Sequence, residues 1–148
     1  MISGSFDALQ TLSARLRWVA GATAHEQLAK KLAREAKKLV ADEFKQSTDP
    51  RGVGWAPLRE QRKRQGKKKR SDKVLINSGN LKGSFSTVES SRGFRIGSDR
   101  NYAKFHQLGT RNMSRRRLFP YAGEITRVWA DAFSKITDKH IRDALEGK

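Results

Sequence analysis

The chain contains no cysteine among its 148 residues. This absence excludes a disulfide framework, a zinc finger and a thiol nucleophile. Long apolar runs are also missing, and acidic Asp7 interrupts the apolar residues near the N-terminus, so the sequence predicts no transmembrane helix and no secretory signal. We therefore expect a soluble intracellular product with no membrane partner, folded as a single domain over residues 1–148.

Acidic residues are scarce, with 15 Asp and Glu against 32 Lys and Arg. The stretch 74–123 has only Glu89 and Asp99 as carboxylates, too few to gather around a catalytic metal. The three histidines, His25, His106 and His140, fall in separate segments without metal-ligand spacing, and no phosphate-binding glycine loop occurs. The sequence therefore predicts no catalytic residue, no metal, no cofactor and no enzymatic activity.

Positive charge is what the chain has in excess, at a net +17, and it is concentrated in the middle. Residues 59–73 carry nine Lys or Arg against two acidic residues, and residues 74–123 carry the same numbers. The first stretch contains a basic arm without any apolar residue: Arg62, Lys63, Arg64, Lys67, Lys68, Lys69 and Arg70. A polyanion or an acidic protein face is the partner that this arm favours, and a merely solvated surface run is the alternative.

Apolar periodicity predicts three long helices. The first covers 5–19, and the second covers 24–46, with Thr23 as its cap and a turn at Gly21 that makes the pair a helical hairpin over 5–46. The buried face expected on the second helix is Leu28, Leu32, Ala36, Leu39, Val40 and Phe44. The third covers 124–146, from about Glu124 to Leu145, with the apolar stripe Ile125, Val128, Trp129, Ala132, Phe133 and Ile136. We expect this stripe to pack on the helical hairpin, with an intersubunit contact as the alternative.

The segments between the helices have other patterns. Residues 47–73 form a loop with the basic arm, in which Asp49-Pro50 stops the helix and Trp55 packs back onto the core. Residues 74–123 form a β-rich region of two to four strands, drawn from "VLINSGNL", "SFSTVES" and "GFRIGSD", with "SSRG" as a hairpin loop. The predicted fold class is α+β: the N-terminal helical hairpin and the C-terminal helix pack on a small antiparallel sheet.

The stretch "NYAKFHQLGT", residues 101–110, predicts a short helix inside the β-rich region. Asp99 or Asn101 would cap it, and Gly109 would close it. Tyr102, Phe105 and His106 share one side at spacings of three and four. We interpret the stretch as a structural clasp, because Gly109 lets the chain reverse toward Arg117 and Phe119.

Four stretches, in this order, resemble the pattern of the phage virion morphogenesis family of tail-completion or neck proteins of tailed phages: "DPRGVGWAPL", "LINSGNLKGSF", "RIGSDRNYAKFHQLGT" and "RRRLFPY". Its most specific element is Tyr-Ala-x-x-His-Gln-x-Gly. In the last stretch Leu118 stands where the family has a proline, and Pro120 comes one step late. The residues that carry the resemblance are Trp55, Leu58, Leu75, Ser78, Gly79, Leu81, Ile96, Gly97, Tyr102, Ala103, His106, Gln107, Gly109, Arg117 and Phe119.

The resemblance implies a non-enzymatic virion component, assembled in the host cytoplasm and placed at the neck or tail end. Such a protein acts as a homo-oligomeric ring, with a hexamer the expected count, around the channel through which packaged DNA leaves. Its further partners would be neighbouring connector or tail-terminator proteins. The alternative function is a free-standing basic protein that binds nucleic acid without sequence preference.

Overall fold

The computed structural model describes residues 21–58, 73–90, 92–121 and 123–146. Along this part of the chain lie α2 (Ala22–Gln46), the 3-10 helix η1 (Lys82–Ser84), β1 (Phe85–Ser90), β2 (Gly93–Ser98), α4 (Ala103–Leu108) and α5 (Arg127–Glu146). Helices combined with an antiparallel hairpin confirm the predicted α+β class. The predicted helix over 5–19 and the basic arm lie outside the described residues.

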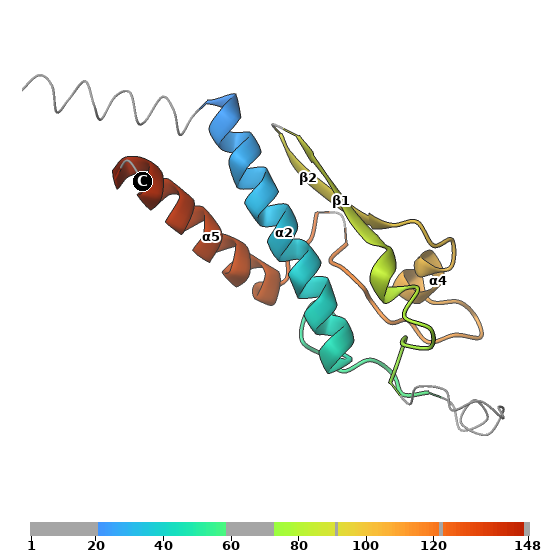
Figure 1. Cartoon of the computed structure of the whole chain (residues 1–148). Helices are drawn as coiled ribbons and strands as arrows, with labels where there is room; N and C mark the ends of the chain where they lie inside the picture. The colour runs from blue at the N-terminus through green and yellow to red at the C-terminus, as the bar shows by residue number, and fades with distance from the viewer. Residues whose placement is uncertain (1–20, 59–72, 91, 122, 147–148) are drawn as a thin grey trace, which may run out of the picture.

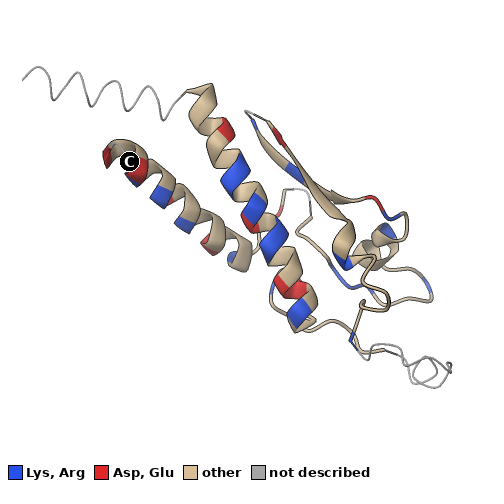
Figure 2. Cartoon of the chain, viewed as in Figure 1, with Lys and Arg blue, Asp and Glu red and all other residues tan. Residues whose placement is uncertain are grey.

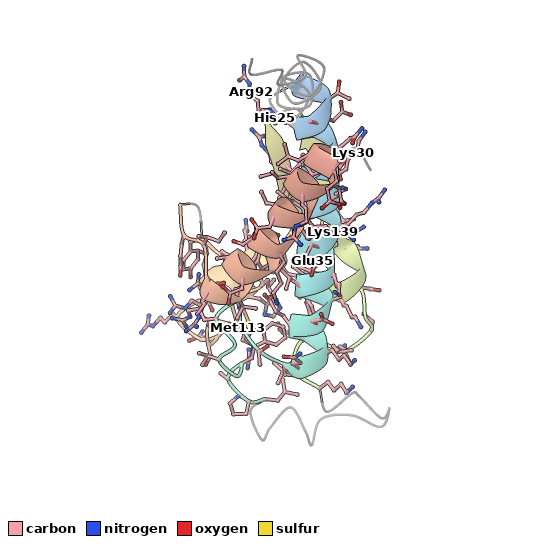
Figure 3. All side chains as sticks on the ribbon, turned by 90° about the vertical axis from the view of Figure 1, so that its left-hand side faces the viewer. His25, Lys30, Glu35, Arg92, Met113 and Lys139 are labelled. Carbon is pink, nitrogen blue, oxygen red and sulfur yellow. The ribbon has the colours of Figure 1, made fainter. Side chains whose placement is uncertain are left out.

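Helix α2 is the central element of the fold. The β1–β2 hairpin lies along one side of it and α5 along the other, while α4 lies beyond the hairpin (Figure 1). Seen from the α5 side, α5 crosses α2, and the labelled side chains of His25 and Arg92 lie at one end of the molecule while Met113 lies toward the other (Figure 3). The expected packing of the C-terminal helix on the N-terminal helical region is confirmed for α2.

The start of α2 differs from the prediction. The helix is preceded by Gly21 as N-cap, without a side-chain capping bond, so Thr23 is not the cap. In the first turns of the helix, Glu26 forms an ion pair with Lys30 at 2.7 Å. Such a pair at four residues stabilises an exposed helix only slightly, so the position of α2 depends on packing rather than on its cap.

The buried face of α2 is turned relative to the predicted one. Ala36, Val40 and Phe44 are buried as expected, whereas Leu28, Leu32 and Leu39 are only half-buried. Alanines are buried where leucines were expected. The reason is that α2 has neighbours on two sides, and alanine allows helices and strands to approach closely. The alanines buried along this face are Ala24, Ala29, Ala33 and Ala36.

The hairpin confirms two of the three expected β-segments. β1 and β2 pair antiparallel from Phe85↔Ser98 to Ser90↔Gly93, so the predicted loop joins them. The stretch "VLINSGNL" forms turns and bends rather than a strand, and Leu75 has a positive φ of 62°. Two strands remain within the predicted range of two to four.

The core is built from aromatic rings on elements far apart in sequence. Phe44 of α2 lies 5.3 Å from the Trp55 ring and 5.9 Å from the Phe85 ring, centroid to centroid. Leu118, at the position where the family has a proline, is completely buried beside them. Because Leu118 fills core volume, the departure from the family pattern is accommodated by packing.

Helix α5 begins at Arg127, three residues later than predicted. Two residues of its predicted apolar stripe, Ile125 and Val128, are exposed. Trp129 is buried, and the Phe133 ring lies 5.8 Å from the Phe94 ring of β2. Only the part of the stripe that faces α2 and the hairpin is therefore core, and the rest is apolar surface.

Candidate functional site

Gln107 is the centre of the clasp that links α4 to the segment after it. Its side chain is 6% exposed. The Oε1 atom accepts the backbone N–H of Leu118 at 2.7 Å and that of Phe119 at 3.3 Å, and Nε2 donates to the carbonyl of Phe119 at 2.8 Å. The side-chain amide thus replaces a backbone partner for a buried stretch that belongs to no strand.

Backbone bonds extend the clasp on either side of Gln107. The Arg116 N–H donates to the His106 carbonyl at 2.8 Å, and Gly109 closes α4 by donating its N–H to the Phe105 carbonyl at 2.9 Å. Gly109 has a φ of 78°, and a Cβ there would lie 3.2 Å from the backbone nitrogen of Arg115. A side chain at this position would be strained both by the backbone angle and by the close approach.

The loop that contains Trp55 is hydrogen-bonded to the same segment after α4, at Arg116 and Arg117. The indole N–H of Trp55 donates to the Arg117 carbonyl at 2.8 Å. The guanidinium of Arg116 donates to the Ala56 carbonyl at 2.9 Å and to the Pro57 carbonyl at 3.0 Å. Two pieces of the family pattern that lie about sixty residues apart in sequence are therefore in direct contact.

A third piece of the pattern, around Gly79 and Leu81, joins this cluster. Leu81 is buried in the core. Gly79, with a φ of 80°, accepts the Gly83 N–H through its carbonyl at 2.9 Å. Together with Tyr102 and His106, these two residues line a hollow of about 350 Å³. The structure thus brings the predicted motif residues together at one end of the molecule.

The clasp differs from the prediction in the residues that form it. Asp99 and Asn101 do not cap α4, whose N-cap is Tyr102 without a side-chain bond. Tyr102 and His106 are in ring contact with centroids 6.2 Å apart, as their spacing predicted. Phe105 is 45% exposed, so the buried contact comes from Gln107 rather than from that ring.

We expect Phe105→Ala to lower the free energy of unfolding by less than about 1 kcal/mol, because much of the ring is in solvent. Thermal or urea unfolding of the two proteins measures the difference. A loss of about 3–5 kcal/mol, which is normal for truncating a buried ring, would contradict the position of Phe105 in the structure.

Arg117 is a buried cation at the inner side of the clasp. Its guanidinium donates to the Glu124 carboxylate at 2.7 Å and stacks 4.1 Å from the centre of the Tyr121 ring. This pair holds the chain that leads into α5. The hydroxyl of Thr126 adds a second attachment, donating to the Pro50 carbonyl at 2.7 Å.

Glu43 is a buried carboxyl group that sequence reasoning missed. It is 7% exposed on α2, and its Oε1 atom accepts the indole N–H of Trp129 at 2.9 Å. Burial raises the pKa of Glu43 to about 8, a rise opposed in part by the bond from Trp129. Glu43 directly precedes Phe44 and lies three residues after Val40. A polar residue at this border of the apolar face was the signal by which the sequence could have indicated a buried carboxyl group.

The basic arm, Arg62 to Arg70, lies outside the described residues, but basic residues also predominate in one stretch of the part that is described. Between Val74 and Tyr121 nine Lys or Arg stand against two acidic residues, whereas Glu124–Glu146 has four against five. Figure 2 shows blue segments along the hairpin and in the loops beside α4. Seven of the nine side chains are exposed: Lys82, Arg92, Arg95, Arg100, Lys104, Arg111 and Arg115.

The described residues contain no group of three or more His, Asp or Glu that could hold a metal ion. Their helices include none that is long and apolar enough to cross a membrane. The described part does contain a clasped core and a stretch, residues 74–121, in which basic residues predominate.

Comparison with known proteins identifies the class more closely. Residues 5–138 match the phage virion morphogenesis family, and the chain belongs to this family. No curated protein and no solved structure matches it. The resemblance drawn from the motifs is thereby confirmed, and it gives the chain a structural role in the assembly of a phage virion.

Proposed function

We propose that the protein acts without catalysis as a ring at the junction of head and tail, around the channel for packaged DNA. The observation that carries the proposal is the uneven distribution of positive charge along a chain whose family has a role in the virion. Residues 74–121, which include the hairpin and α4, carry nine Lys or Arg against two acidic residues, whereas the α5 region is close to neutral. A ring of such subunits can turn one face to DNA and the other to protein.

The α5 region supports contacts with protein on the other face. Ile125, Val128 and Ile141 are exposed apolar residues on or beside this helix. Its charges are of both signs, among them the pair Arg127–Asp131 at 3.9 Å. Apolar residues with a mixed polar rim are typical of protein interfaces, and the partners proposed here are neighbouring connector or tail-terminator proteins.

Native mass spectrometry over a concentration series tests the ring. We expect a closed oligomer of defined mass, with a hexamer the expected count, that grows with protein concentration. A protein that stays monomeric at every concentration and binds duplex DNA at low salt would instead support the alternative, a free-standing nucleic-acid-binding protein.

The contribution of the basic arm to DNA binding is a separate prediction. In a salt series, we expect the variant with Lys67, Lys68, Lys69 and Arg70 changed to Gln to bind duplex DNA more weakly. Its log-log slope should be shallower by about 0.9 for each phosphate that the arm no longer neutralises. The same change of charge on the helices, with Lys37, Lys38, Lys45 and Lys135 changed to Gln, is the control, because these exposed residues belong to α2 and α5 and not to the basic arm.

Binding should also be independent of sequence, since lysine and arginine on phosphates read no base edges. An arm variant with an unchanged slope would contradict a DNA contact by the arm. If that variant binds DNA normally but fails to join heads to tails, the partner of the arm is a neighbouring protein.

A further inference from the structure

A hollow of about 450 Å³ lies between the first turns of α2 and the loop end of the hairpin. Figure 3 shows two of its members, His25 of α2 and Arg92 directly before β2, at the same end of the molecule. The hollow is separate from the clasp, which lies around α4. The residues that line it are His25, Leu28, Ala29, Leu32, Arg92 and Gly93.

Leu28 and Leu32 give this hollow its apolar character. A spacing of four places both on one face of α2, and both remain half-buried although the hairpin and α5 pack on this helix. Within the described part, neither leucine belongs to the core cluster or packs against it, whereas Leu39 on the same helix does. Two neighbouring leucines outside the described core indicate a further apolar contact at this place.

The stretch of chain before α2 has an apolar stripe that matches the hollow. In residues 5–19 apolar side chains recur at spacings of three and four, which is the spacing of one helix face. A helix over this range is about 22 Å long, long enough to run from the start of α2 past Leu32. The members of the stripe are Phe6, Leu9, Leu12, Leu16 and Val19.

We propose that residues 5–19 form a helix that turns back at Gly21 and packs its apolar stripe into this hollow, on Leu28 and Leu32 of the same subunit. Gly21 has an extended backbone, with φ −77° and ψ 156°, so the helical path of α2 does not continue into it. A short connection gives the segment an effective concentration at the hollow of about a millimolar or more, which favours it over a second copy or a foreign helix. This contact does not depend on the ring.

The level of each side chain along α2 follows from the common rise of about 1.5 Å per residue. When two antiparallel helices meet at Gly21, residues at equal sequence distance from Gly21 lie side by side. Leu12 is then level with the stretch between Leu28 and Leu32. The middle of the apolar stripe therefore meets the two half-buried leucines.

The charges of the segment agree with this antiparallel direction. Arg15 and Arg17 come level with the first turns of α2, where Glu26 is the first charged side chain. Asp7 comes level with residues 31–38, where four Lys or Arg stand against one acidic residue. Pairs at the surface contribute little to stability, so apolar burial holds the segment and the charges suit its direction.

Cysteine cross-linking tests this contact, because the chain has no cysteine of its own. One double variant carries Leu12→Cys with Leu28→Cys, and a second carries Leu12→Cys with Leu32→Cys, which allows for a shift of one helical turn. The matched control carries Leu12→Cys with Lys30→Cys. Lys30 is exposed at the same level of α2, but it is turned about 200° around the helix from Leu28.

The three double variants are oxidised at low protein concentration, and mass spectrometry separates disulfides within one chain from disulfides between chains. Because a disulfide requires Cα atoms within about 7 Å, we expect one of the two leucine pairs to form an internal disulfide at least about tenfold more often than the control pair. Equal yields in all three variants, or an internal disulfide in none of them, would overturn the proposal. A disulfide found only between chains would assign the hollow to another copy and would overturn it as well.

Hydrogen exchange of the wild type gives a second readout without any substitution. A lone helix of this length is marginal in water, so lasting protection of the amides in residues 9–19 requires that the segment pack on the protein. We expect these amides to exchange more than about tenfold more slowly than in an unstructured chain. Leu32→Asp should remove this protection while the amides of α5 keep theirs. Unprotected amides in residues 9–19 of the wild type would overturn the contact, whatever native mass spectrometry shows of the ring.

Discussion

Replacing Glu43 with glutamine should stabilise the protein at pH 8 by a few kcal/mol and remove most of the pH dependence of its stability between about 4.5 and 8. Burial raises the pKa of Glu43 to about 8 from its ordinary value of 4.5. Between these values the unfolded chain releases a proton that the folded chain retains, so the free energy of unfolding falls by about 1.4 kcal/mol for each pH unit.

The sign of this effect follows from the direction of the pKa shift. The stabilising contribution of protonated Glu43 is complete below pH 4.5 and is lost as pH rises through about 8. Glutamine cannot ionise, and its side-chain carbonyl can still accept the indole N–H of Trp129. Urea unfolding of wild type and variant at a series of pH values measures the difference between them.

Other groups with shifted pKa values do not disturb the comparison. Burial lowers the pKa of His140, and hydrogen bonds lower the pKa of Asp49 despite its burial. Both residues are present in wild type and variant alike, so the contribution of His140 cancels in the difference, and that of Asp49 cancels apart from its repulsion of the Glu43 carboxylate, which itself raises the pKa of Glu43. A difference that is the same at pH 5 and at pH 8 would contradict a buried, protonated Glu43.

Replacing Gln107 with methionine should lower the free energy of unfolding by about 3 kcal/mol. Methionine has a similar shape, but it leaves the N–H of Leu118 and the carbonyl of Phe119 without the amide that now bonds them. A buried backbone group without a partner costs about 1–3 kcal/mol. Thermal and urea unfolding measure the loss.

Two variants show whether this loss comes from the clasp. Gln46→Met makes the same chemical change at an exposed position at the end of α2 and should alter stability by at most about 0.5 kcal/mol. Gln107→Glu keeps an acceptor for Leu118 but replaces the donor to Phe119 with a buried carboxylate, whose desolvation adds to the loss, so it should also be less stable than wild type. If Gln107→Met were as stable as wild type, the segment after α4 would not depend on the clasp.

The long helices and the hairpin were predictable from the sequence because their signals are local. The three-four spacing of apolar residues predicted α2 and α5, and the alternation around "SSRG" predicted β1 and β2. The details that failed depend on neighbours far along the chain. Leu28 and Leu32 are half-buried because packing on two sides of α2 selected alanines for the closest contacts.

The candidate site was predictable as a set of residues but not as a set of contacts. The motifs identified Gln107 and Trp55 as structural residues, yet only the fold shows that both bond to the backbone of one segment, at Phe119 and Arg117. The shared spacing of Tyr102, Phe105 and His106 indicated one side of a helix. It could not indicate that the side with Ala103 and Gln107 faces inward, because that depends on where the later segment returns.

The role in joining heads to tails is tested most directly in lysates of the phage that encodes this chain, with the gene removed. Electron microscopy and plaque titration are carried out before and after purified protein is added. We expect separate heads and tails without the protein, and joined, infectious particles after addition of wild type but not of a variant that cannot form the ring. Normal particles at full titre in the absence of the protein would contradict this role.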